Sequence, residues 1–370
     1  MASLTQSRNR AYLLLANGTL FEGYSFGVPG TMIGEVVFTT SMTGYQETLT
    51  DPSYYGQIVT QTFPLIGNYG VNHEDYESSR SWVQGYIVRE WCDTPSNFRS
   101  EGDIDSFLKS HGIVGICGID TRQLTRIIRE HGVMNGVITT QDAVAKRDEL
   151  LERINSYEIE GAVEATSLIE PARFECEGDK PAKHNVVLMD YGYKYNIRHE
   201  LTKRGCSITI MPASSTVEDI LAQNPDGIML SNGPGDPSKC EHQIEVLREL
   251  TKHQIPTFGI CLGHQLLALA NGAQTMKLKY GHRGANQPVV DNKIGRVLIT
   301  SQNHGYAVVG ETIDPQVGAV SHENQNDNTC EGVEYTNCPA FTVQFHPESC
   351  SGPNDTNYLF DRFLTMMEEN

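Results

Sequence analysis

Hydrophobic and polar residues follow different patterns in the two parts of this 370-residue chain. In residues 1–150, short apolar runs such as 35–39 and 57–61 are separated by Gly, Pro and Asn, which is typical of strands joined by turns. One helix is expected between Asp120 and Gly132, because an acidic cap, apolar positions at helical spacing and a terminal glycine follow one another there. The pattern predicts a strand-rich, mixed N-terminal domain.

Residues 185–370 repeat a different unit, in which a short apolar strand is followed by a helix. Branched apolar strands that alternate with helices predict a parallel sheet covered by helices on both faces, the doubly wound α/β class. Functional groups gather at the carboxyl ends of such strands. The polar, turn-rich stretch 151–184 is interpreted as a linker. The predicted strand–helix pairs are 186–189 with 198–203, 207–211 with 217–223, 227–230 with 243–252, and 257–260 with 264–270.

Composition narrows the possible partners. Lys and Arg number 28 against 46 Asp and Glu, and the net charge of −18 repels phosphate backbones, so no nucleic-acid partner is expected.

The nine cysteines are scattered without a C-x-x-C pair, which favours a reducing compartment over a disulfide framework or zinc ribbon. The apolar run 11–16 that follows the polar N-terminal stretch is too short for a signal peptide or membrane helix. We therefore expect a cytoplasmic protein with no membrane partner.

The sharpest chemical signal is a Gly-x-Cys-x-Gly motif centred on Cys261, where a predicted strand runs directly into a helix. Gly259 and Gly263 suit the sharp strand-to-helix turn that exposes a nucleophile. A helix N-terminus favours the thiolate, and the backbone N–H of Leu262 is a candidate oxyanion donor. The alternative is a buried, inert cysteine.

A cysteine nucleophile requires a general base, and the base requires an orienting group. His346 ends an apolar strand, and Glu348 stands two residues further on, where its carboxylate is expected beside the imidazole. The alternative is a structural histidine. A zinc site that joins this histidine to Cys330, Cys338 and Cys350 is set aside, because the spacings are irregular and no close ligand pair occurs. No metal is expected.

The loop 231–237, Ser-Asn-Gly-Pro-Gly-Asp-Pro, follows another predicted strand. It matches neither the dinucleotide-binding nor the Walker pattern, so nucleotide binding is not supported. Its backbone N–H groups are candidate oxyanion donors, and the alternative is a simple tight turn.

These three motifs, in this order, resemble the class I, or triad, glutamine amidotransferases. Further segments are similar to carbamoyl-phosphate synthase, and several in the first domain are similar to the small subunit of that enzyme, whereas other class I amidotransferases lack this domain. The resemblance covers nearly the whole chain. The segments are 34–38, 43–47, 50–54, 64–68 and 118–122 in the first domain, and 232–237, 264–270, 281–284 (read as a turn), 286–288 and 301–306 in the second.

The resemblance implies a role for each matched residue. Cys261 forms a glutamyl thioester, His346 serves as base and acid, and Glu348 orients His346. Leu262 and Gly233 supply the oxyanion N–H groups. Many members of the family carry Phe at the position of Tyr306. The implied glutamine-binding residues are Ser53, Gly233, Gly235, Leu262, Gln265, Asn303, Gly305 and Tyr306.

The family's activity is hydrolysis of L-glutamine to supply ammonia to a large synthetase subunit. That subunit makes carbamoyl phosphate from bicarbonate and ATP, for pyrimidine and arginine biosynthesis. ATP and Mg²⁺ are therefore expected on the partner, and no cofactor is expected in this chain. The alternatives are the glutaminase component of another synthase, a non-catalytic regulatory subunit, and a thiol protease, against which the amidotransferase motifs argue.

Overall fold

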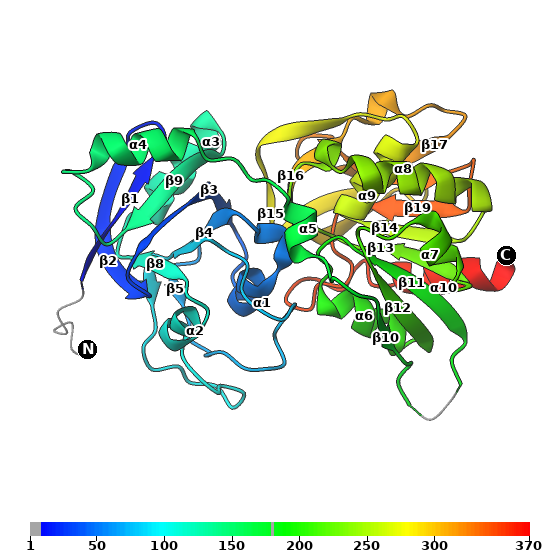
Figure 1. The fold of residues 1–370 in the computed structure, drawn as a ribbon, viewed down its shortest axis with the longest axis horizontal. Helices are drawn as coiled ribbons and strands as arrows, with labels where there is room; N and C mark the ends of the chain where they lie inside the picture. The colour runs from blue at the N-terminus through cyan, green and yellow to red at the C-terminus, as the bar shows by residue number, and fades with distance from the viewer. Residues whose placement is uncertain (1–8, 179–180) are drawn as a thin grey trace. The chain divides into compact units, whose positions relative to one another are not determined.

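The computed structural model describes residues 9–178 and 181–370. It consists of two compact units, Met1–Ile159 and Glu160–Asn370, which run from blue to green and from green to red in Figure 1. Residues 1–8 of the polar N-terminal stretch and residues 179–180 of the predicted linker lie outside the described residues. Within residues 9–178 and 181–370, no helix combines the length and the apolar composition needed to cross a bilayer.

The first unit is built on a closed β-barrel with strand order β1-β2-β8-β6-β4-β3-β9. The β3–β4, β4–β6 and β6–β8 pairs are parallel and the other pairs antiparallel, which confirms the expected mixed, strand-rich domain. Closure of the sheet removes its exposed edges. The barrel strands are Arg10–Leu15, Leu20–Gly27, Thr31–Thr39, Gln57–Gln61, Gly85–Ile87, Val114–Cys117 and Met134–Thr139 (β1, β2, β3, β4, β6, β8 and β9), and β5 (Leu65–Ile66) pairs separately with β7 (Glu90–Trp91).

The helix expected after Asp120 is confirmed as α3 (Thr121–His131). The Asp120 carboxylate accepts a hydrogen bond from the backbone N–H of Gln123 at 2.9 Å, and the N–H of Gly132 donates to the Ile128 carbonyl at 2.8 Å. The cap and the glycine thus satisfy backbone groups at both helix ends. The other helices of this unit are α1 (Tyr45–Thr50), the 3₁₀ turn η1 (Pro52–Tyr54), α2 (Ile104–Ser110) and α4 (Arg147–Asn155).

The second unit contains a ten-stranded sheet, counted within the described residues, with order β10-β12-β11-β13-β14-β19-β18-β16-β15-β17. Its centre, from β12 to β19, is parallel, as the strand–helix repeats predicted, whereas β10 and the strands beyond β19 pair antiparallel. The strands are β10 (Ala172–Phe174), β11 (His184–Asp190), β12 (Cys206–Pro212), β13 (Gly227–Leu230), β14 (Thr257–Ile260), β15 (Thr275–Asp291), β16 (Arg296–Val308), β17 (Gly318–Asn324), β18 (Cys330–Tyr335) and β19 (Ala340–Val343).

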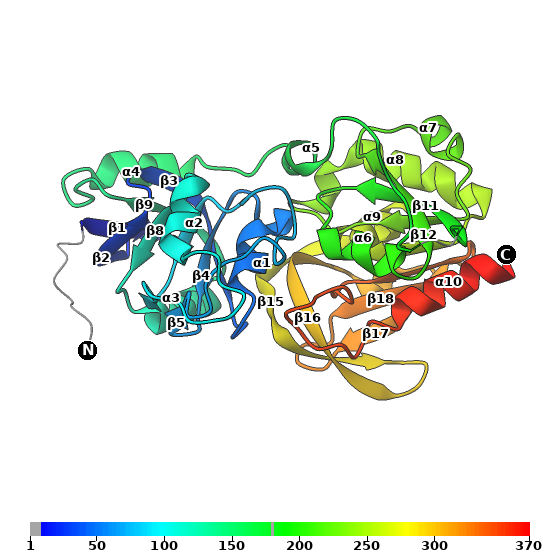
Figure 2. The same cartoon turned by 90° about the horizontal axis from the view of Figure 1, so that it is seen from below.

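Helices cover both faces of this sheet, which confirms the doubly wound class (Figure 2). Apolar side chains of α7, α8 and α9 form one core with one face of β11 and β13, and α6 and α10 form a second core on the opposite face. The helices are α5 (Ala162–Thr166), α6 (Tyr195–Thr202), α7 (Val217–Leu221), α8 (Glu241–Leu250), α9 (Leu262–Ala270) and α10 (Leu359–Glu369), with 3₁₀ turns η2 (Pro237–Lys239), η3 (Thr251–His253) and η4 (Gly310–Thr312).

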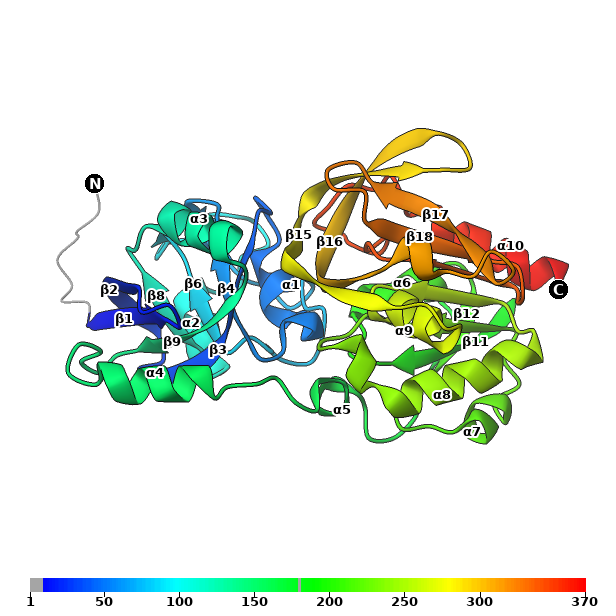
Figure 3. The same ribbon diagram turned by 90° about the horizontal axis from the view of Figure 1, so that it is seen from above.

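The long antiparallel hairpin of β15 and β16 differs from what the sequence predicted. Residues 281–284, expected to form a turn, lie inside β15, where the pairing with β16 shifts register between Lys277 and His282 and again between Gly284 and Gln287. Irregular pairing of this kind allows turn-forming residues inside a strand, so the turn-like sequence of residues 281–284 does not end β15. Figure 3 shows the hairpin, in yellow and gold, extending beyond the rest of the sheet.

The predicted linker, 151–184, contains regular structure in its described part. The two units meet in sequence between Ile159 and Glu160. Beyond that point, α5 (Ala162–Thr166) forms a short helix, and β10 (Ala172–Phe174) adds to the edge of the second unit's sheet by antiparallel pairing with β12.

The first turn of α9 packs tightly against strand β13. A Cβ built at Gly263 would lie 2.5 Å from the Leu230 carbonyl oxygen and 2.6 Å from the Leu230 Cβ. The neighbouring atoms belong to the backbone of a central strand and cannot rotate away, so only glycine fits here.

We expect Gly263→Ala to lower the free energy of unfolding of the second unit by about 1–3 kcal/mol, the usual cost of overpacking. Urea unfolding followed by far-UV circular dichroism measures this change. Both tryptophans, Trp82 and Trp91, lie in the first unit, so tryptophan fluorescence supplies an internal reference. Gly30→Ala, where the nearest atom would lie at an ordinary 3.4 Å, is the control. An unchanged circular dichroism midpoint for Gly263→Ala would contradict the packing argument.

Candidate active site

Cys261 occupies the sharp turn that its motif predicted. It follows β14 directly, caps α9, and has φ 52° and ψ −102°, a backbone conformation that non-glycine residues rarely adopt. Two hydrogen bonds hold the turn: the N–H of Cys261 donates to the Val343 carbonyl at 2.9 Å, and the N–H of Gly263 donates to the Ser231 carbonyl at 3.0 Å. The segments after β13 and β14 and the end of β19 therefore fix the position of the thiol.

The expected contact between His346 and Glu348 is present. Both side chains are buried, and Nδ1 of His346 lies 2.7 Å from a Glu348 carboxylate oxygen. The N–H of His346 also donates to the Ser301 carbonyl at 2.9 Å, which ties the residue to β16. Among the described residues, the buried Nε2 of His346 has no hydrogen-bond partner. It is therefore the ring nitrogen left to accept or donate a proton.

A third charged residue, Lys194, completes this arrangement. Its ammonium lies 2.6 Å from the same Glu348 oxygen, and both side chains are almost fully buried. Burial alone would raise the pKa of Glu348, but Lys194 and then His346 outweigh it and lower that pKa to about 2. Glu348 therefore stays ionised at neutral pH and holds Nδ1 of His346 as a donor.

The sheet topology brings the cysteine and the histidine to one edge. Strands β14 and β19 are parallel neighbours with Ile260 paired to Val343, so Cys261 and His346 both follow the carboxyl ends of adjacent strands. A buried thiol and an oriented imidazole in this arrangement are suited to nucleophilic attack on a carbonyl group.

Three of the predicted glutamine-binding residues of the second unit make contacts with the thiol or with one another. Sγ of Cys261 lies 3.8 Å from the Asn303 carbonyl oxygen. Nε2 of Gln265 donates to the Tyr306 carbonyl at 2.8 Å and contacts Oε1 of Gln344 at 2.9 Å. The segment of β16 that contains Asn303, Gly305 and Tyr306 is thus connected both to the sharp strand-to-helix turn at Cys261, called the elbow below, and to α9.

The loop after β13 also reaches the elbow. A Cβ at Gly233 would lie 2.2 Å from the Tyr191 carbonyl oxygen and 2.8 Å from the Leu262 side chain, so the two predicted oxyanion donors are neighbours. The side-chain oxygen of Asn232 accepts the N–H of Lys194 at 3.1 Å, which links this loop to the lysine. Gly235 has φ +94° and stands beside Ala162.

Ser53 belongs to the first unit, in the turn η1. Its side chain is nearly buried, and its N–H donates to the Asp51 carboxylate at 2.9 Å. Its assignment to glutamine binding stays a prediction.

Sequence reasoning missed Lys194 and a group of buried polar residues on β15, β16 and β18. Lys194 stands in a loop after β11 in no recognisable motif, and only its position after a strand of the parallel sheet could have suggested it. In the part of the chain that the structure describes, His282, His304 and Glu331 have potential metal-ligating atoms within 4.8 Å of one another. None of the cysteines weighed from the sequence belongs to this group.

The comparisons with known proteins agree with this geometry. Residues 187–366 match the family described as glutamine amidotransferase class-I, so the second unit is a class I glutamine amidotransferase domain. Residues 13–138 match the family described as carbamoyl-phosphate synthase small chain, CPSase domain. This second match argues against the alternative of a glutaminase component of another synthase.

Curated relatives extend the match over nearly the whole chain. Carbamoyl phosphate synthase small chains are 50% identical over 356 residues in Listeria monocytogenes serotype 4b, 48% over 360 residues in Symbiobacterium thermophilum, and 49% over 375 residues in Syntrophotalea carbinolica. The alignments cover 96%, 96% and 98% of this chain and 96%, 98% and 98% of those proteins. The chain belongs to the carbamoyl-phosphate synthase small-chain family.

We expect Lys194→Met to lower the free energy of unfolding of the second unit by about 3–5 kcal/mol, because it leaves Glu348 as a buried carboxylate without its cation. Lys203→Met is the matched control, since Lys203 is half-exposed and its ion pair with Glu200 is worth at most about 1 kcal/mol. Urea unfolding by circular dichroism compares them. Equal losses in the two variants would contradict a special role for the buried pair.

The lowered pKa of Glu348 also predicts a pH dependence. Its contribution to stability is fully present above the ordinary carboxyl pKa of 4.5 and is lost as pH falls toward the folded-state pKa of about 2. The second unit of the wild type should therefore lose stability between pH 5 and pH 3, and Glu348→Gln should flatten this slope. Unfolding at a series of pH values measures both slopes, and parallel slopes would refute the assignment.

Proposed function

We propose that Cys261, His346 and Glu348 are the catalytic residues with which this chain hydrolyses L-glutamine. The observation that carries the proposal is the buried imidazole of His346, whose Nδ1 is held by Glu348 while Nε2 is left without a partner among the described residues. Its strand neighbours the one that ends at the elbow of Cys261. As a member of its family, the chain supplies the resulting ammonia for carbamoyl phosphate synthesis.

The chemistry follows from these positions. The Cys261 thiolate attacks the side-chain carbonyl carbon of glutamine, and a C–S bond forms. His346 then gives the proton on Nε2 to the amide nitrogen, the C–N bond breaks, and ammonia leaves a glutamyl thioester. Water attacks the thioester while His346 takes one of its protons, and the C–S bond breaks to release glutamate. Glu348 stabilises the imidazolium in each half of the cycle.

The groups around the elbow support the remaining roles. The backbone N–H groups of Leu262 and Gly233 would stabilise the oxyanion of each tetrahedral intermediate. Gly235, Gln265, Asn303, Gly305 and Tyr306 would bind the substrate, and Ser53 is proposed as a further glutamine-binding residue.

The family membership implies a large subunit as partner. Ammonia is mostly protonated in neutral water and cannot attack in that form, so we infer a sheltered route from Cys261 to the partner. ATP, Mg²⁺ and bicarbonate would be bound by that subunit, and this chain would need no cofactor. The product enters pyrimidine and arginine biosynthesis.

The proposal includes a cytoplasmic location and no nucleic-acid or membrane partner. The net charge of −18 supports the first exclusion, because acidic proteins are repelled by phosphate backbones.

We expect Cys261→Ser to lower glutamine-dependent ammonia release by about three orders of magnitude or more, because the nucleophile acts as one unit with its base. Ammonia release by the full chain, alone and with a carbamoyl-phosphate synthase large subunit plus ATP and bicarbonate, measures this loss. Stimulation by the partner with carbamoyl phosphate formed is the expected wild-type result. Synthesis from added ammonium chloride is the control and should persist in the variant. A wild-type chain without ammonia release in either condition would indicate a non-catalytic subunit.

A further inference from the structure

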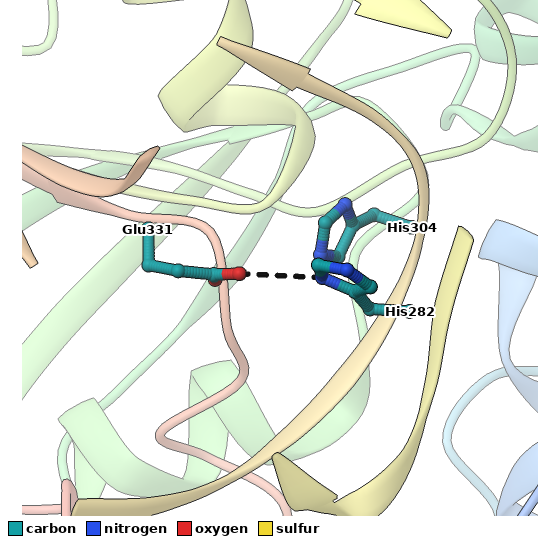
Figure 4. Close-up of side chains that lie close together, drawn as sticks. All are labelled: His282, His304 and Glu331. Carbon is teal, nitrogen blue, oxygen red and sulfur yellow. Dashed lines mark ion pairs between the residues drawn. The ribbon is translucent and has the colours of Figure 1, made fainter. Parts of the chain in front are cut away.

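A buried charged cluster lies beside the segment of β16 that contains Asn303 and Tyr306. Figure 4 shows its three central side chains, with His282 and His304 close together and Glu331 directed toward them. His282 comes from β15, His304 from β16 and Glu331 from β18, and all three are buried. In β15 and β16, His282 pairs directly with His304.

His282 is held as a cation. Its Nε2 lies 2.8 Å from the Asp327 carboxylate and its Nδ1 lies 3.3 Å from the Glu331 carboxylate, so both ring nitrogens face acceptors and both must be donors. Burial opposes this charge, but the two carboxylates outweigh it and raise the pKa of His282 to about 9. One imidazolium therefore lies between two carboxylates.

Glu331 is fully buried and surrounded by donors. Besides His282, its carboxylate accepts hydrogen bonds from Gln302 at 3.0 Å, Asn324 at 3.2 Å and Thr329 at 3.3 Å. Burial raises the pKa of Glu331 above its usual value, and the imidazolium of His282 and the Asn324 amide oppose this rise. The carboxylate thus fixes the side chain of Gln302.

His304 connects this cluster to the substrate-binding segment. Its Nε2 lies 3.2 Å from Oε1 of Gln302, and its Nδ1 lies 2.7 Å from the carbonyl oxygen of Tyr306. Burial and the neighbouring charge of His282, whose ring lies edge-on at 4.9 Å, lower the pKa of His304 well below its usual range. His304 is therefore neutral and carries a single ring proton, which the shorter contact places on Nδ1 as the donor to the Tyr306 carbonyl, while Nε2 packs against Gln302 without donating to it.

A second route from Glu331 reaches the same oxygen. The backbone carbonyl of Glu331 accepts the N–H of Gln344 at 2.8 Å, and Oε1 of Gln344 accepts Nε2 of Gln265 at 2.9 Å. Gln265 in turn donates to the Tyr306 carbonyl at 2.8 Å. The Tyr306 carbonyl is thus held from two sides, by His304 and by Gln265, and only the route through His304 involves the Glu331 carboxylate.

We propose that the ion triad of Asp327, His282 and Glu331 is a positioning device for the glutamine-binding segment 303–306. The Glu331 carboxylate fixes Gln302, and the His282 ring and Gln302 pack against His304. His304 then holds the Tyr306 carbonyl, and the segment keeps the shape that binds glutamine. None of the three residues is among the predicted glutamine-binding residues, so we assign them as positioning residues. The inference rests on the proposed function and extends it to residues outside the catalytic triad.

The test compares Glu331→Gln with Glu334→Gln, a matched control on the same strand whose carboxylate forms a partly exposed ion pair with Arg362. In the full chain with its large subunit, we expect Glu331→Gln to raise the KM for glutamine about tenfold or more, the effect of leaving buried polar groups without their partner. The kcat, and the rate of alkylation of Cys261 by iodoacetamide, should stay within about threefold of the wild type, because the nucleophile is not part of the network.

A double variant tests the charge itself. His282→Gln combined with Glu331→Gln removes the buried cation together with its carboxylate, and the KM should lie closer to the wild-type value than that of Glu331→Gln alone. Where Glu331→Gln does not fold, His282→Gln gives the same comparison. An unchanged KM in a destabilised Glu331→Gln chain, or parallel losses of kcat and of alkylation, would overturn the positioning role.

Two further measurements separate a positioning role from catalysis and from metal binding. Glutamine binding to the Cys261→Ala chain, measured by calorimetry, removes the chemical step, and a Kd that Glu331→Gln leaves unchanged refutes the inference. A wild-type chain that binds glutamine but releases no ammonia refutes the proposed function instead. Elemental analysis that finds one tightly bound metal ion per chain, lost in His282→Gln, would replace the hydrogen-bonded triad with a metal site.

Discussion

The second unit depends on a backbone conformation at Cys261 that a non-glycine residue does not adopt without support. Hydrogen bonds to the ends of neighbouring segments hold this residue at φ 52°, and the first turn of α9 packs so closely on β13 that Gly263 leaves no space for a side chain. Strain of this kind persists only where the surrounding structure determines it from several directions. The central strands of the sheet, rather than a mobile loop, therefore decide where the sulfur lies.

Two groups of ionisable side chains, all buried except the exposed Asp327, accompany this turn, and in each group acidic and basic side chains lie together. Lys194 and His346 meet Glu348, and His282 lies between Glu331 and Asp327. Isolated charges would be costly to bury, whereas paired and hydrogen-bonded charges fix geometry. In the first group, Nε2 of His346 is the atom without a partner among the described residues, which suits the position at which a proton must move.

The antiparallel β15–β16 hairpin extends the sheet with a long strand pair that the strand–helix repeats do not contain. It supplies Asn303 and Tyr306 near the elbow and carries the histidines that link them to β18. Parallel sheets already present loops at one edge, and the hairpin adds a continuous strand whose carbonyl groups can be held by hydrogen bonds. Substrate contacts on such a strand are more rigid than contacts on a free loop.

The sequence by itself determined the strand–helix order of the second unit, the elbow at Cys261 and the pairing of His346 with Glu348. These features depend on residues close together in the chain, where spacing and residue type restrict the backbone directly. The tertiary structure alone placed Lys194 against Glu348, located residues 281–284 inside β15 rather than in a turn, and assembled His282, His304 and Glu331. Such contacts join residues far apart in sequence, so no local pattern records them. Strand pairing and the exclusion of water decided which charges meet.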